Sequence, residues 1–116
     1  MMEGADRARA LLGVRGFGDD VSETEPDVPV EELGAIGAIA YEWRTSSVRA
    51  AVYAFDDQDA ARAAEDALVT PAERVVATTV NGALLMVASA AEDDLLGQDQ
   101  LGRLRSNFAG RERDRE

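Results

Sequence analysis

The sequence predicts an α+β fold: a four-stranded, mainly antiparallel sheet made of two hairpins, with helices packed on one face. Two observations predict the sheet. Apolar and polar residues alternate between residues 39 and 55, and Asn81-Gly82 separates two further apolar runs. Ala- and Leu-rich segments with acidic starts predict the helices. The expected element order is α-β-β-α-β-β-α, because strands that are close in sequence usually pair as neighbours.

Residues 1–35 are expected to precede the α+β domain as a short helix and an acidic loop. Residues 3–12 have the spacing of a short, weakly amphipathic helix. Residues 19–32 contain seven acidic residues and no arginine, a composition typical of a solvated or disordered loop. The α+β domain is therefore expected to cover residues 36–110, followed by a charged tail at residues 111–116.

The first hairpin is predicted by two alternating runs on either side of Thr45-Ser46-Ser47. With a three-residue loop, Trp43 lies opposite Arg49, and this register decides which side chains share a face. The small side chains of Val48, Ala50, Val52 and Ala54 would then form one face, which either packs against the helices or is left over if the helices cover the other face instead. The opposite, aromatic face would gather Ile39, Tyr41, Trp43, Tyr53 and Phe55.

The second hairpin has the clearest local pattern. Asn81-Gly82 is the pair that best tolerates the positive φ angles of a two-residue turn, so Val80 is expected opposite Ala83. Leu85 and Met86 fall on opposite faces, and both faces are apolar.

A helix is expected after each hairpin. Asp56 opens the first, which Thr70-Pro71 would stop, and the second runs from Glu92 onward.

The apolar character of both sheet faces predicts self-association. A sheet with helices on one face normally presents polar residues to water on the other. Here one apolar face is surplus, and the amino-terminal helix, a ligand or a second copy of the chain could bury it. We expect a homodimer, with the interface formed by Tyr41, Trp43, Tyr53, Phe55 and Met86.

The residue types that the chain lacks exclude most catalytic chemistries. There is no Cys and no His, and all 12 basic residues are Arg. Disulfides, thiolate nucleophiles, Cys/His zinc sites, Ser-His-Asp triads and Schiff-base lysines are therefore excluded. The chain is not expected to be an enzyme or to hold a cofactor.

Two acidic clusters are candidates for a cation site. Asp56, Asp57 and Asp59 follow the first hairpin. Glu92, Asp93 and Asp94 follow the second, so the clusters could meet at one edge of the sheet. Carboxylates bind hard cations such as Ca²⁺ and Mg²⁺. Helix capping explains both clusters more simply, because acidic residues stabilise the first turn of a helix.

The charge of the chain limits its partners. Its net charge of −11 disfavours nucleic acid and anionic membranes, and favours a basic protein. No apolar run is long enough to span a membrane, and the start lacks the apolar core of a signal peptide. The sequence as written indicates a cytoplasmic protein, or an exported one if a leader has been trimmed.

Three segments carry a resemblance: VRAAVYAFDDQDAARAAEDAL, VNGALLMVASAAEDD and the closing NFAG. Over residues 36–110 the chain resembles a loose set of small uncharacterised bacterial β-β-α-β-β-α proteins, many of them exported or lipid-anchored. The chain lacks the lipobox cysteine of the anchored members, and the resemblance implies no activity, cofactor or site residue.

The sequence thus favours a non-catalytic binding or assembly module that self-associates through an apolar sheet face. The alternative is a small-molecule or divalent-cation site at the sheet edge, built from the acidic clusters, where paired carboxylates could do acid–base work.

Overall fold

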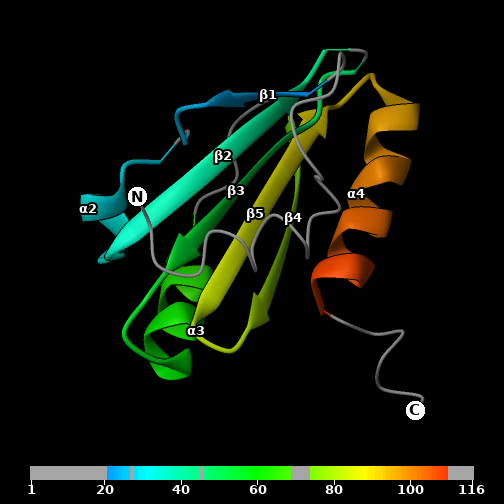
Figure 1. Cartoon of the computed structure of the whole chain (residues 1–116). Helices are drawn as coiled ribbons and strands as arrows, with labels where there is room; N and C mark the ends of the chain where they lie inside the picture. Colours follow the sequence, from blue (N-terminus) through cyan, green and yellow to red (C-terminus); the bar gives the residue numbers. More distant parts are fainter. Residues whose placement is uncertain (1–20, 27, 45, 69–73, 110–116) are drawn as a thin grey trace.

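The computed structural model describes residues 21–26, 28–44, 46–68 and 74–109. They form a five-stranded antiparallel sheet in the order β1-β2-β3-β5-β4 (Figure 1). The elements, in chain order, are β1 (Val21–Thr24), α2 (Val30–Leu33), β2 (Gly37–Trp43), β3 (Arg49–Ala54), α3 (Gln58–Ala67), β4 (Arg74–Asn81), β5 (Leu84–Ala91) and α4 (Leu95–Ala109). The predicted α+β class and the two antiparallel hairpins are confirmed. The predicted helix at residues 3–12 lies outside the described residues.

The fifth strand comes from the acidic segment that was expected to be a loop. β1 pairs antiparallel with β2, from Val21 opposite Trp43 to Thr24 opposite Ala40. Arg44 reinforces this pairing by donating from Nε to Ser22 Oγ at 2.9 Å. The sheet therefore has five strands and not the predicted four. β1 supplies hydrogen-bonding partners for the backbone groups on the outer side of β2.

The first hairpin has a register one residue away from the predicted one. Trp43 N–H donates to Val48 O at 3.0 Å, and Tyr41 lies opposite Ala50, so the loop comprises residues 44–47. A slip of one residue exchanges the faces of one strand relative to its neighbour. Tyr41 therefore lies on the opposite face from Tyr53, and the predicted single aromatic face does not exist.

The second hairpin slips by two residues, with a different outcome. Asn81 pairs with Leu84, so Gly82 and Ala83 form the turn. Gly82 has a φ of 62°, which the first position of a two-residue hairpin turn requires. Because side chains alternate with a period of two, Leu85 and Met86 keep their predicted faces.

Helices pack on both faces of the sheet, which corrects the prediction of helices on one face. Figure 1 shows α4 alongside β4 and β5, whereas α3 lies near the end of the sheet where β3 finishes. α4 contributes Leu101, Leu104 and Phe108 to one core. α3 contributes Ala61 and Ala64 to the other, where side chains from α2 and its flanking residues also pack. Both faces of the sheet are apolar and have to be buried. α3, which follows β3, covers one face, and α4, which follows β5, covers the other.

The two cores are separated by the sheet itself. The α4-side core contains Ile39, Tyr41, Val48, Ala50, Val52, Ala54, Leu84, Met86, Ala88, Ala90, Leu101, Leu104 and Phe108. The α3-side core contains Ala40, Ala51, Tyr53, Phe55, Ala61, Ala64 and Leu85. In the described part of the chain no helix is long and apolar enough to cross a membrane.

Candidate functional site

The four candidate carboxylates for a cation site lie at opposite ends of the sheet. Asp56 and Asp57 follow β3, and Glu92 and Asp93 follow β5. β3 and β5 are antiparallel neighbours, so their carboxyl ends point in opposite directions. The sequence-based idea that the two clusters meet at one edge was wrong, because it assumed that the two hairpins finish at the same end. Among the described residues no group of three or more Asp and Glu could hold a metal ion.

The first of these clusters serves helix capping. Asp57 is the N-cap of α3, and its Oδ1 accepts from the amide of Ala60 at 2.8 Å. This bond satisfies one of the backbone donors that a helix start leaves unpaired. Glu92 and Asp93 are exposed before α4, where the capping position belongs to Asp94.

The five residues predicted for a dimer interface pack inside the chain. Tyr41 and Met86 are 0% exposed and lie in the α4-side core, and the half-buried Trp43 packs against it. Tyr53 and Phe55 are buried in the α3-side core, and Tyr53 donates its hydroxyl to the carbonyl of Val28 at 2.7 Å. Four of these five side chains are therefore closed to a second chain, and Trp43 is partly so.

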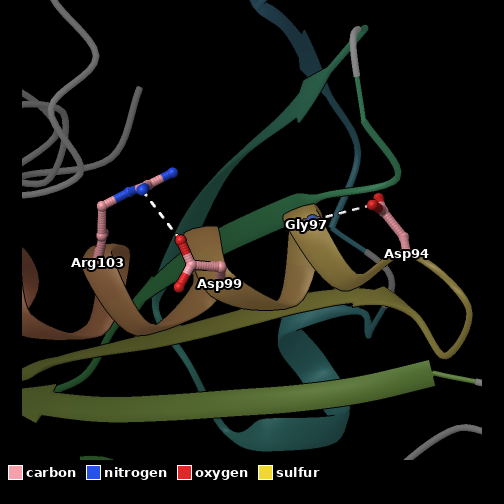
Figure 2. Close-up of polar contacts among 4 residues, drawn as sticks. All are labelled: Asp94, Gly97, Asp99 and Arg103. Atoms are coloured by element: carbon pink, nitrogen blue, oxygen red, sulfur yellow. Dashed lines mark hydrogen bonds and ion pairs between the residues drawn. The ribbon is translucent and has the colours of Figure 1, made fainter.

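A polar cluster that the sequence did not indicate lies at the end of the sheet where α4 begins. Asp94 is its centre. Its Oδ2 accepts from the amide of Ser47 at 2.9 Å and from the Ser47 hydroxyl at 2.7 Å, and its Oδ1 accepts from the amide of Gly97 at 2.9 Å. Figure 2 shows the Asp94 carboxylate turned toward the Gly97 amide. One carboxylate thus caps α4 and holds the β2–β3 loop.

Arg74 and Ser89 extend the cluster onto β4 and β5. Arg74 donates from Nη2 to the carbonyl of Ser47 at 2.7 Å and from Nε to Ser89 Oγ at 3.0 Å. Ser47 Oγ in turn accepts from the amide of Ala91 at 2.8 Å. The polar groups of this cluster are thus used to fasten β4, β5, the β2–β3 loop and the start of α4 to one another.

The same hydrogen bonds set the electrostatics of Asp94. The pKa of Asp94 lies below the ordinary value of an aspartate, mainly because the Ser47 hydroxyl donates to the carboxylate, and then because the Ser47 and Gly97 amides do. A carboxylate with a lowered pKa is a weaker base, which makes it poorly suited to activate the Ser47 hydroxyl. The observed bonds of this carboxylate join the β2–β3 loop to the start of α4.

Asp94→Asn is expected to lower the melting temperature at neutral pH and to flatten the acid side of the stability profile. The folded pKa of Asp94 is lowered, so its contribution to stability is present above the ordinary aspartate pKa and is lost as the pH falls through the folded pKa. Thermal unfolding from pH 7 to pH 2 measures this. The exposed pair of Asp99 with Arg103, at 3.1 Å (Figure 2), supplies the control Asp99→Asn, which should change the profile little. Equal acid profiles for D94N and wild type would contradict the assignment.

A small cavity lies on the α3 side of the sheet. It measures about 40 Å³, and its lining includes Thr24, Val28, Ala51, Tyr53 and Ser89. That volume accommodates a few water molecules, whereas small-molecule sites usually measure about 300–1,000 Å³. The cavity therefore fits bound water better than a substrate.

The two edges of the sheet differ in a way that bears on binding. β1 forms one edge with 4 residues, including the exposed Glu23, and β4 forms the other with 8 residues. Between Arg74 and Asn81, β4 has no charged residue and no proline. Proteins usually protect an edge strand by keeping it short or by placing charged residues or proline in it. β4 is 8 residues long and has neither charge nor proline between its end residues.

β4 is also held firmly from both sides. On the α3 side, Thr78 Oγ1 donates to Glu65 Oε2 at 2.7 Å. At the turn end, Asn81 Nδ2 donates to the carbonyl of Phe108 in α4 at 2.7 Å. No other strand pairs with the outer side of β4 in the described part of the chain. A partner strand would therefore meet an edge strand that is already fastened to α3 and α4, which lowers the ordering entropy lost on binding.

Comparisons of the chain with protein-family models, with curated proteins and with solved structures find no match. The resemblance to small bacterial β-β-α-β-β-α proteins stays a prediction. The candidate site is therefore defined by geometry alone, and it is the outer side of β4, which no other strand pairs with among the described residues.

Proposed function

We propose that the chain is a non-catalytic assembly module that associates with a second copy of itself. One observation carries the proposal: an edge strand of 8 residues, uncharged between its end residues, lies at the limit of the sheet and is fixed by a helix on each face. Such an edge is a template for pairing with another chain. The location of the association differs from the sequence-based expectation, because the sheet faces are occupied by the chain's own helices.

The charge of the chain supports an uncharged contact strand. Each copy has a net charge of −11, so two copies repel one another at long range. The contact that brings them together should therefore avoid acidic groups. β4 is suited to this role, because its only charged residue is the cation Arg74.

Light scattering over a concentration series tests the proposal. The mass is expected to rise from 12.4 kDa toward twice that value as the protein concentration increases from about 1 µM to about 1 mM. The midpoint should move to lower concentration when the salt is raised from about 0.05 M to about 0.5 M, because salt screens the repulsion between the two copies. A mass of 12.4 kDa throughout the series at both salt concentrations would overturn the proposal.

A further inference from the structure

We infer that two copies pair antiparallel through their β4 edges about a two-fold axis at Ala77, which makes one continuous sheet from both chains. The inference rests on the proposed function and specifies its partner and geometry.

The outward backbone groups follow from the register of the second hairpin. Asn81 and Leu84 flank the two-residue turn and form a hydrogen-bonded pair. Because hydrogen-bonded and non-hydrogen-bonded pairs alternate along an antiparallel ladder, Thr79, Ala77 and Val75 also bond to β5. The remaining residues direct N–H and C=O away from β5: Arg74, Val76, Thr78 and Val80.

One register uses all four outward residues. If Val76 lies opposite Thr78 of the second copy, Arg74 lies opposite Val80, and the two-fold axis passes between the Ala77 residues. This arrangement forms about eight backbone hydrogen bonds, two for each hydrogen-bonded pair. The Thr78 carbonyl already accepts from Thr79 Oγ1 at 2.8 Å, and its second lone pair remains for the partner.

A second copy suits this edge because the pairing is self-complementary and brings no like charges together. In the proposed register each Arg74 faces a valine, and the residues at the centre of the contact are neutral. Val75 is 37% exposed, and its partner in this register is Thr79. A β-branched pair of this kind stabilises neighbouring strands. The two Ala77 side chains are small enough for close approach at the axis.

Single cysteines test the axis directly, because the chain has no cysteine of its own. A residue on the two-fold axis faces itself in the second copy. Ala77 occupies a non-hydrogen-bonded pair, in which the Cα atoms lie about 4.5 Å apart, within the range of disulfides. Ala77→Cys is therefore expected to form a disulfide-linked dimer under mild oxidation, at least about ten-fold faster than either control.

The matched controls are Val75→Cys and Thr79→Cys. Each moves the thiol two residues from the axis, which separates the two thiols by about 13 Å along the strands. Each should remain largely uncrosslinked alone, whereas a mixture of V75C and T79C should form the mixed disulfide. Equal or faster crosslinking of T79C or V75C alone would overturn the register.

A proline variant provides a second test. Val76→Pro removes an outward N–H and no bond to β5, and should therefore give a folded monomer by light scattering and circular dichroism. If V76P does not fold, the comparison of A77C with V75C and T79C still tests the register of the two strands. If wild-type mass doubles while A77C does not crosslink, or while a folded V76P remains dimeric, the inference fails and the proposed function stands. A wild-type chain that stays monomeric throughout the concentration series overturns both.

Discussion

Met86→Asp is expected to unfold the chain. Met86 is 0% exposed in the α4-side core, among Val52, Leu104 and Phe108. The introduced carboxylate would lose its hydration in this core without gaining a cationic partner. This loss lowers the free energy of unfolding by several kcal/mol. A domain of this size is stable by only about 5–15 kcal/mol, so the folded state should lose most of its population.

Far-UV circular dichroism and Trp43 fluorescence at low protein concentration measure the outcome. Leu96→Asp is the matched control, because it introduces the same charge at a side chain that is 83% exposed. That variant should unfold close to the wild-type temperature. A folded M86D monomer would contradict the placement of this face in the core and would favour the sequence-based view of an open sheet face.

Leu85→Ala is expected to destabilise the chain by about 3–5 kcal/mol. Leu85 is adjacent to Met86 in β5 but points to the other face, where it is 0% exposed and packs in the core with Ala61 and Ala64 of α3. The small alanines of α3 lie close to the sheet, so the space left by the leucine is poorly filled by its neighbours.

Urea unfolding measures the free-energy change, and Leu95→Ala is the control, because Leu95 is 75% exposed. The control should change the free energy of unfolding by less than about 0.5 kcal/mol. A loss below about 1 kcal/mol for L85A would mean that α3 does not bury this face. Together with M86D, the measurement decides whether two adjacent residues on opposite faces are both in a core.

The fold class was predictable because it depends on periodicity, whereas the contacts between strands depend on register. The Asn81-Gly82 prediction placed the turn one residue early, which moved the pairing by two residues and left the faces of β5 correct. The first loop was one residue too short, and that single residue separated Tyr41 from Tyr53. Composition does not distinguish a three-residue loop from a four-residue loop when both contain Thr and Ser.

The predicted cation site was wrong because of the topology of the sheet. The prediction followed the chain from each hairpin into a helix, but it did not place β5 directly beside β3 in the opposite direction. Asp94 belongs to the second acidic cluster, and the helix capping expected of that cluster is what its bond to the Gly97 amide provides. Its bonds to Ser47 span 47 positions in sequence and could not be predicted from local pattern.

The two edge positions of the sheet, which β1 and β4 occupy, were also not predicted from the sequence. Residues 21–24 lie in an acidic segment, but they pair with the outer side of β2, and Val21 packs against the α4-side core. β4 was predicted as a strand, but its position at the edge follows from β5 lying between it and β3. That order makes β4 available to a partner.

Amide hydrogen exchange along β4 tests the central claim most directly. At concentrations where the mass doubles, the amides of Val76, Thr78 and Val80 should exchange slowly, and on dilution they should exchange quickly. The amides of Val75, Ala77 and Thr79 bond to β5 and should be protected at both concentrations. If Val76, Thr78 and Val80 exchange equally fast in the dilute and the concentrated protein while the mass doubles, the two copies do not meet through β4.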